Sequence, residues 1–288
     1  MSQGAKLRAL LRDGMVVAPF VFDGLTAKIA QAAGFSAVYR TGHGTAARLG
    51  MTDAGLVTFS EMLENLNYVC DAVDVPVIAD ADTGYGNAVN VTRTVRAYEK
   101  AGAAALHIED QVFPKKCGFF EGKQVVAVEE HVQKVRAALE ARRDEDFVII
   151  ARTDALAVHG WEETVRRCKA YAAAGADLVF VDGIKTVQDL DIYQREVIAA
   201  GLPCMYNGSL VSTQDAAARG FSLMITGGGH GIAYLAMREA LHELRRTGRH
   251  PAPAPEPEYF MGIADLLGVH EVNGIERRFA VEAPASAR

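Results

Sequence analysis

Carboxylates end two apolar runs within residues 75–123. The first run, VPVIADADTGYGN, reaches Asp80 and Asp82, and the second, ALHIEDQ, reaches Glu109 and Asp110. Acidic side chains have no packing role at the end of a buried strand, and several of them together repel one another, so a divalent cation is their natural partner. Carboxylate oxygens favour Mg²⁺, or Mn²⁺, over Zn²⁺. Helix capping would explain a single Asp here, but the cluster predicts a metal site.

A cysteine lies in a charged, glycine-flanked stretch shortly after these carboxylates. Cys117 follows Lys115 and Lys116 and precedes Gly118. A thiol beside two ammonium groups loses its proton more readily than an isolated thiol, so it can exchange a proton at neutral pH. Gly118 and Gly122 allow the loop to close and exclude water. The other cysteines stand in helical or strand contexts that indicate packing roles: Cys70, Cys168 and Cys204.

Eight short apolar runs supply the strands that would position these groups. Four of them follow a helix that ends in Ala and Gly, as in QAAGFSAVY and KAGAAALHI, which is typical of stacked helix–strand units. Eight such units in 288 residues predict an α/β fold, the (β/α)₈ TIM-type barrel. A doubly wound open sheet is the alternative, but no GxGxxG follows the first run. The expected strands are 15–20, 37–41, 76–80, 105–109, 147–152, 178–182, 204–207 and 222–226, and the expected helices include 88–101, 127–142, 161–174 and 186–200.

A barrel of this kind carries its chemistry at the carboxyl ends of its strands. The expected strand ends are polar, although the strands themselves are apolar. They comprise residues 39–44, Asp80, Asp82, Glu109, Asp110, 152–154, Asp182, 207–209 and the TGGGH segment at 226–230. This polar ring predicts an active site at that end of the barrel.

Composition narrows the class of protein. Half of the residues are hydrophobic, the net charge is −6 and the pI is about 5.8, which argues against nucleic acid or an anionic membrane as the main partner. The sequence has no 18-residue apolar run and its first residues lack the apolar core of a signal peptide. The cysteines are scattered, without a CxxC motif. We therefore expect a cytoplasmic protein with reduced thiols.

The tail after the eighth unit differs from the rest. We expect a barrel domain at 1–249 and a separate segment at 250–288, which begins with the stiff, proline-rich PAPAPEPE. Apolar residues then recur at helical spacing at Phe260, Ile263 and Leu267. Because a helix beyond a complete barrel must still bury its apolar face, we expect it to pack on a neighbouring subunit.

The motifs DADTGYGN, HIEDQ, KKCG and RTDA occur in this order and the helical tail follows them. Together they resemble the isocitrate lyase/phosphoenolpyruvate mutase superfamily over nearly the whole chain, and KKCG at its distance from DADTGYG is the most specific part. The resemblance implies a Mg²⁺-dependent site, with Mn²⁺ possible, for a small carboxylic or oxo acid. It also implies a C-terminal helix swapped between subunits of a homo-oligomer, a tetramer built from pairs of dimers.

The resemblance assigns the metal site and the gate residue by residue. Asp82 would contact the metal, Asp80 and Glu109 would hold metal-bound waters, and Asp53 would lie in the same shell. Residues 113–123 match a mobile gate in which Cys117 is the acid/base. The neighbouring Lys115 and Lys116 and the substrate-binding Arg152 are the other candidate catalytic residues.

The remaining matches would bind the substrate. The segment with Tyr39, Thr41, Gly42 and His43 matches one that binds the carboxylate of the oxo acid through backbone N–H groups. Asn207 and Ser209 match a polar pair that contacts a second carboxylate. The candidate substrate-binding set is completed by Gly118, Phe119 and Asp182.

Two departures from the lyase pattern bear on the substrate. Phe119 stands where the lyases carry His, so the gate loses a hydrogen-bond donor, and Asp182 stands where they carry Glu, which leaves more space. His230 could replace the missing His or could simply lie near a helix N-terminus.

Four classes of function therefore compete. The first is a carbon–carbon lyase that cleaves a substituted malate or a methylisocitrate-like acid through an enolate of a 2-oxo acid. The second is an oxaloacetate-type decarboxylase or hydrolase with the same enolate chemistry. A phosphonopyruvate-type mutase or hydrolase is disfavoured by Cys117, and a binding-only protein is disfavoured because all four expected metal-site carboxylates are present.

Overall fold

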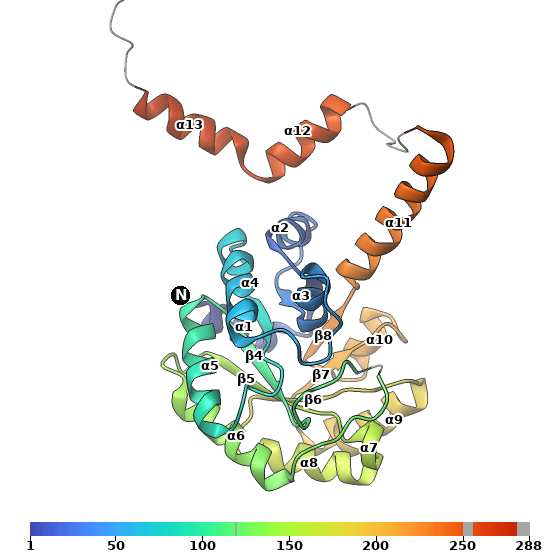
Figure 1. Ribbon diagram of the computed structural model, residues 1–288. Helices are drawn as coiled ribbons and strands as arrows, with labels where there is room; N and C mark the ends of the chain where they lie inside the picture. The colour runs from blue at the N-terminus through green and yellow to red at the C-terminus, as the bar shows by residue number, and fades with distance from the viewer. Residues whose placement is uncertain (119, 250–255, 281–288) are drawn as a thin grey trace, which may run out of the picture. The chain divides into compact units, whose positions relative to one another are not determined.

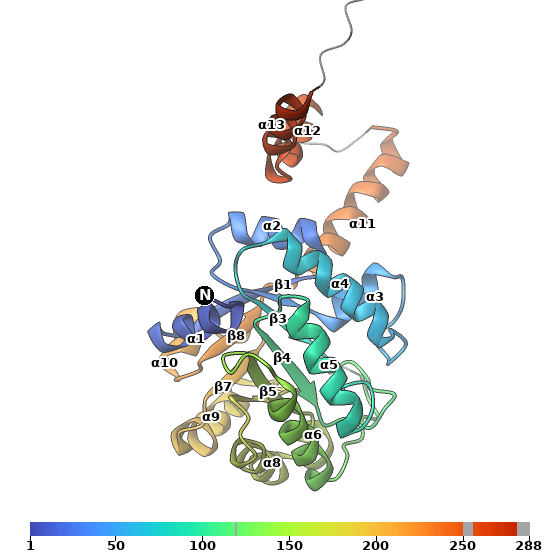
Figure 2. The same cartoon turned by 90° about the vertical axis from the view of Figure 1, so that its left-hand side faces the viewer.

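The computed structural model describes residues 1–118, 120–249 and 256–280 and contains a closed barrel of eight parallel strands in the order β1 to β8. Figures 1 and 2 show the strands in the middle of the barrel unit with helices around them. All eight predicted strands are confirmed to within one residue, and the closed order rules out the open sheet. The strands are β1 Val16–Val21, β2 Val38–Arg40, β3 Val77–Asp80, β4 Ala105–Glu109, β5 Val148–Thr153, β6 Leu178–Val181, β7 Cys204–Asn207 and β8 Leu223–Thr226.

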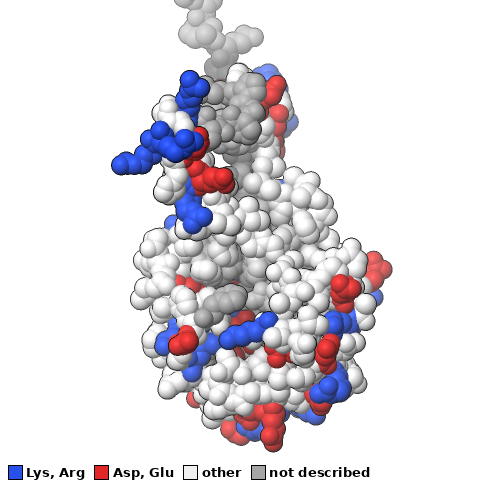
Figure 3. All heavy atoms as spheres, turned by 90° about the vertical axis from the view of Figure 1, so that its right-hand side faces the viewer, with Lys and Arg blue, Asp and Glu red and all other residues white. Residues whose placement is uncertain are grey.

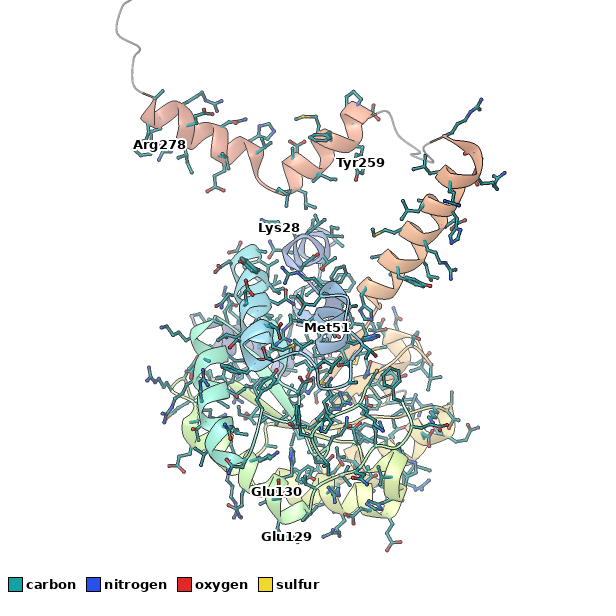
Figure 4. The ribbon with its side chains drawn as sticks, viewed as in Figure 1. Lys28, Met51, Glu129, Glu130, Tyr259 and Arg278 are labelled. Carbon is teal, nitrogen blue, oxygen red and sulfur yellow. The ribbon has the colours of Figure 1, made fainter. Side chains whose placement is uncertain are left out.

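Helices precede the first strand, connect successive strands and follow the last one. They are α1 Gln3–Asp13, α2 Gly24–Ala32, α3 Gly42–Arg48, α4 Phe59–Ala72, α5 Ala88–Lys100, α6 Val128–Ala141, α7 Leu156–His159, α8 Trp161–Ala173, α9 Val187–Glu196, α10 Thr213–Ala218 and α11 Gly229–Thr247. Helix α6 has no side-chain cap, but Glu129 and Glu130 lie in its first turn, where negative charge complements the helix dipole (Figure 4). The helix expected at 186–200 is shorter, because α9 ends at Glu196 and Ile198–Ala200 form a 3₁₀ turn.

The strands are buried on both faces, as their apolar sequences predict. One set of side chains, including Ile78, Ile150 and Phe180, fills the barrel interior. The alternate residues, such as Ile149 and Val179, pack under the surrounding helices. The helix α1 adds the fully buried Leu7 to the interior cluster, next to the first residues of several strands. The polar ends of the strands therefore lie at the opposite mouth of the barrel.

The chain divides into two compact units, Met1–Ala233 and Tyr234–Arg288. The domain boundary expected at residue 249 stays a prediction. In the second unit the single tail helix expected from the sequence is two helices, α12 Glu256–Leu266 and α13 Val269–Phe279. They are separated at Gly268, whose φ of +87° is a left-handed conformation that interrupts a right-handed helix.

The surface charges of the barrel unit are mixed. Figure 3 shows basic and acidic side chains close together on the face that it displays, without a broad area of one sign. Among the described residues, no helix combines the length and the apolar character needed to cross a bilayer.

The tail helices expose large apolar side chains. Phe260 on α12 and Phe279 on α13 are 73% and 71% exposed, and Tyr259, labelled in Figure 4, is 62% exposed. Burying several side chains of this size would contribute several kcal/mol per subunit at about 25 cal/mol per Å². We therefore expect truncation after Arg249 to lower the mass of the assembly measured by light scattering. An assembly of unchanged mass would contradict a role of the tail in oligomerisation.

Candidate active site

Two aspartates at the end of β3 form the base of the site. The N–H of Asp82 donates a hydrogen bond to Oδ1 of Asp80 (2.9 Å), and the N–H of Gly42 donates to its Oδ2 (3.1 Å). A Cβ atom at Gly42 would lie 2.6 Å from that oxygen, so only glycine fits at this position. Asp82 has a φ of +46°, a left-handed conformation that sets its side chain beside Asp80. The local backbone thus brings both carboxylates to the mouth of the barrel, as expected.

Lys115 joins this group of carboxylates. Its Nζ lies 2.8 Å from Oδ1 of Asp82 and 2.5 Å from Oδ1 of Asp53, and all three side chains are buried. Burial lowers the pKa of Lys115, but the surrounding carboxylates outweigh it and raise this pKa well above its usual value. An ammonium ion therefore stands at the carboxylates predicted to bind a metal, and Asp53 belongs to the group, as the sequence predicts.

Burial disfavours the charged form of the clustered carboxylates. Burial raises the pKa of Asp82 and raises that of Glu109 well above its usual value. At Asp80 burial acts in the same direction, but His107, Lys115 and Arg152 outweigh it and hold the pKa below its usual value. Oδ1 of Asp82 and Oε2 of Glu109 form ion pairs with Lys115 and Arg152 but have no other hydrogen-bond partner among the described residues. A bound cation would favour the charged forms of these carboxylates.

These oxygens fit a cation that keeps most of its water. Within the described parts of the chain, no three His, Cys, Asp or Glu side chains converge closely enough to coordinate one ion directly. Mg²⁺ is commonly held by one or two carboxylates and several waters, and the donor set of Asp80, Asp82 and Glu109 consists of oxygen alone. The chemistry of the donor set therefore suits Mg²⁺, and the division into one direct ligand and several water-mediated ones stays a prediction.

Arg152 on β5 lies between Glu109 and Asp182 at the mouth of the barrel. Its Nη1 lies 3.2 Å from Oε2 of Glu109 and its Nη2 lies 3.1 Å from Oδ2 of Asp182. Asp154 orients the guanidinium, accepting from Nε at 2.8 Å, and Lys123 donates to Asp154 at 2.8 Å. The sequence placed Asp154 in the polar ring without a role and gave no signal for Lys123, which pairs with a residue 31 positions away.

Gly118 lies directly against Asp182. A Cβ atom at Gly118 would lie 2.2 Å from Oδ2 of Asp182, whose other oxygen accepts from Nδ2 of Asn207 at 3.4 Å. The structure thus brings together three of the predicted substrate-binding residues, from the gate, β6 and β7.

Gly118→Ala should therefore lower kcat/KM by roughly 10²-fold, because a gate displaced by about 1 Å can cost that much. The measurement is steady-state kinetics with the thermal midpoint as a check on folding. Gly231→Ala is the matched control, since the added carbon would meet no described atom within 4 Å beyond the adjacent residues and backbone of its own helix. Equal kinetics for both variants would show that the close approach has no catalytic role.

Tyr39 lies below the carboxylates, inside the barrel. Its hydroxyl lies 3.3 Å from Oδ2 of Asp80 and 2.7 Å from Nε2 of His107, and the two rings stack. Burial raises the pKa of Tyr39 well above its usual value and lowers that of His107 to about 4. Thr41, by contrast, caps α3 by accepting from the N–H of Gly44.

Other predicted residues lie away from this centre. The exposed ring of His43 packs edge-on against His230 with 4.6 Å between centroids. Ser209 is exposed, and Nζ of Lys116 donates to the carbonyls of Glu121 and Gly122 within its own loop. Phe119 lies outside the described residues.

Cys117 is half-buried beside the metal-site residues. Its backbone N–H donates to the carbonyl of Asp53 (3.0 Å), whose side chain pairs with Lys115. Among the described residues no cysteine forms a disulfide. The packing roles expected for Cys168 and Cys204 agree with their complete burial.

Asp110 belongs to the framework and not to the site. It is fully buried and accepts hydrogen bonds from Thr153, Arg167 and Tyr171 (2.7–2.9 Å) and from the N–H of Asp154. All of its partners lie between the strands and the outer helices. Asp110 therefore does not lie with Asp80, Asp82 and Glu109, the other carboxylates that end the two apolar runs.

Sequence comparison now identifies the family. Residues 7–245 match the family described as phosphoenolpyruvate phosphomutase. The chain belongs to the phosphoenolpyruvate mutase/isocitrate lyase superfamily. This membership confirms the family resemblance of its motifs.

Two relatives within the superfamily are lyases. The chain is 40% identical over 287 residues to 2,3-dimethylmalate lyase of Eubacterium barkeri, a match that covers 97% of this chain and 99% of the relative. It is 46% identical over 197 residues to 2-methylisocitrate lyase of Aeropyrum pernix, which covers 68% of this chain and 63% of the relative.

Solved structures of other superfamily members share the fold. An oxaloacetate acetylhydrolase bound to 3,3-difluorooxalacetate has a TM-score of 0.88 and 36% identity, with 96% of each chain covered. A phosphonopyruvate hydrolase complex with oxalate and Mg²⁺ has a TM-score of 0.87 and 33% identity, covering 97% of this chain and 99% of that one. The superfamily fold therefore carries several chemistries.

Proposed function

We propose that this protein is a Mg²⁺-dependent carbon–carbon lyase that cleaves a 2-hydroxy di- or tricarboxylate of the substituted malate or methylisocitrate type. The observation that carries the proposal is the position of Cys117, whose backbone is hydrogen-bonded to Asp53 within the Asp53–Lys115–Asp82 group. A proton donor beside a charged site for an oxo acid is what cleavage of such a bond needs.

The metal would be held by Asp82 directly and by Asp80, Glu109 and Asp53 through water. When bound, it would supply a positive charge that favours loss of the hydroxyl proton and polarises the carbonyl group of the 2-oxo acid product. A Mg²⁺ complex with oxalate exists for the phosphonopyruvate hydrolase that shares this fold. The oxygen donor set described above supports the same choice of metal here.

The residues of the chain would act on the two ends of the substrate. Arg152, a buried guanidinium held by Asp154, would bind a carboxylate and fix its direction. The substrate hydroxyl would give its proton to a water molecule, and its oxygen would form the carbonyl of the 2-oxo acid as the carbon–carbon bond breaks. The electron pair of that bond would pass to the departing carbon. Cys117 would donate the proton to that carbon, while the segment around Gly118 excludes water.

Hydrolysis or decarboxylation of an oxaloacetate-type acid is the second candidate. It is favoured by the likeness to oxaloacetate acetylhydrolase over 96% of the chain and by Phe119, because the lost gate His would matter less for this reaction. A phosphonopyruvate-type reaction is a weaker candidate, because the KKCG sequence with Cys117 differs from the gate sequence usual in enzymes of that type.

A panel of acids with Mg²⁺ separates these candidates. We expect release of a 2-oxo acid from alkyl-substituted malates to exceed that from isocitrate, because Phe119 removes a polar contact from the gate and burying an alkyl group regains about 1–3 kcal/mol. Pyruvate, glyoxylate, acetate and phosphate release should be measured in parallel. Oxaloacetate as the best substrate would replace the lyase with the hydrolase or decarboxylase, and isocitrate or methylisocitrate as the best would contradict the role of Phe119.

A further inference from the structure

Gln111 is a buried side chain that ends the HIEDQ motif and has no role in the proposed mechanism. It follows the end of β4 by two residues, is 2% exposed, and lies between the metal-site carboxylates and the gate. Its amide can donate two hydrogen bonds and accept two. The contacts it makes join parts of the site that are otherwise separate.

One nitrogen of the amide serves both parts. Nε2 of Gln111 donates to Oε1 of Glu109 at 2.8 Å and to the backbone carbonyl of Lys116 at 2.9 Å. Its Oε1 accepts from the backbone N–H of Lys116 at 3.0 Å. The side chain therefore pairs with both polar groups of the residue that precedes Cys117 and holds one oxygen of Glu109 at the same time.

The other contacts of Lys116 and Glu109 show what the Gln111 side chain adds. The side chain of Lys116 donates to carbonyls of its own loop. Gln111 therefore holds residue 116 through its backbone N–H and carbonyl groups. Glu109 is fully buried and its other oxygen, Oε2, faces Arg152 at 3.2 Å. Gln111 thus fixes which oxygen of Glu109 stays available toward the metal site.

We propose that Gln111 is a positioning residue that couples the closed arrangement of residues 115–118 to the orientation of Glu109. A displaced gate would free the amide, and a freed amide would release Glu109. The inference rests on the proposed function for the roles of Glu109 and Cys117. Second-shell partners of this kind typically change metal affinity or activity by 10–100-fold when they are removed.

Two measurements that need no turnover test the coupling. The first is the rate at which iodoacetamide alkylates Cys117, followed by mass spectrometry of its peptide. The second is the affinity for Mn²⁺, followed by electron paramagnetic resonance. In Gln111→Ala we expect alkylation about tenfold faster than in the wild type, since two ordinary hydrogen bonds to the segment are lost, and Mn²⁺ binding at least tenfold weaker.

Gln124→Ala is the matched control. Gln124 faces the same short β-bridge, and its backbone carbonyl accepts from the N–H of Val112, but its side chain is exposed. We expect wild-type values in both measurements. If Gln124→Ala changes as much as Gln111→Ala, general loosening of the bridge explains the effect and the proposal is overturned.

Gln111→Glu guards against a variant that fails to fold. It adds a carboxylate beside Glu109 that can itself attract a cation, so only the alkylation rate is read here: the variant keeps the size and the acceptor for the N–H of Lys116 but loses the bond donated to the carbonyl of Lys116, and we expect faster alkylation than in the wild type. Wild-type alkylation in either folded Gln111 variant, or wild-type Mn²⁺ affinity in folded Gln111→Ala, would overturn the coupling. If the wild type binds no Mn²⁺ at all, the proposed function fails, and the alkylation rates alone still decide whether Gln111 holds the gate.

Discussion

Asp82→Asn is expected to lower kcat by roughly 10³-fold or more, and removal of metal with EDTA should do the same until Mg²⁺ or Mn²⁺ is restored. A bound metal contributes several kcal/mol of charge stabilisation, and about 1.4 kcal/mol corresponds to a factor of ten. Asparagine is chosen because it keeps the shape of the side chain and tolerates the φ of +46° at this position, whereas alanine would add backbone strain. Steady-state kinetics across a metal titration measures the effect.

The fold of this variant should survive, which makes the result interpretable. Burial raises the pKa of Asp82, so the charged form is disfavoured in the metal-free protein and an uncharged replacement should not lower the thermal midpoint. Lys115 keeps its pairing with Asp53. Asp71→Asn, an exposed position on α4, is the matched control and should retain wild-type kinetics. Full activity in metal-free protein would refute the metal-dependent mechanism.

The barrel could be predicted because its strands are short, apolar and bounded by glycine. A run such as ALHIE in β4 is buried on both faces, so continuous hydrophobicity and the preceding Gly102 mark it without any alternation. The tail was harder to predict. Its apolar spacing is continuous, and only the left-handed Gly268 divides it into two helices.

The alternation of side chains along a strand explains where the site prediction failed. Residues 107 and 109 of β4 face the barrel interior, so His107 could have been expected beside Glu109. Asp110 is the next residue, and it faces the layer between strands and helices, where Arg167 and Tyr171 neutralise it. The sequence pattern grouped Asp110 with the other carboxylates because it did not take into account that successive side chains point to opposite faces of a strand.

The remaining parts of the site depend on contacts between distant residues. Lys115 meets Asp53, 62 positions away, and Gln111 meets the peptide of Lys116 through a turn that no short motif describes. A sequence lists such polar groups but does not say which of them pair. Motifs at the strand ends were therefore predictable, and the network that orders them required the structure.

Cys117→Ser is expected to lower kcat by about 10²- to 10⁴-fold while KM changes by no more than a few fold. General acid–base groups contribute rate enhancements of this size, and a serine hydroxyl is a far weaker acid than a thiol. The substitution keeps the size and the backbone hydrogen bond from residue 117 to Asp53, so binding by Arg152 and the metal-site carboxylates should persist. A loss confined to kcat is the mark of a group that acts in the transition state.

Cys70→Ser is the matched control for this prediction. Cys70 is also half-buried, but it lies on α4, where burial raises the pKa of its thiol to about 12, and it packs against the core between strands and helices. The same substitution there should cost some stability and leave kcat within about twofold, because a packing residue takes no part in proton transfer. If Cys117→Ser retained nearly the wild-type kcat, the thiol would not be the proton donor. Solvent would then supply the proton, and the decarboxylase would become the better account of the site.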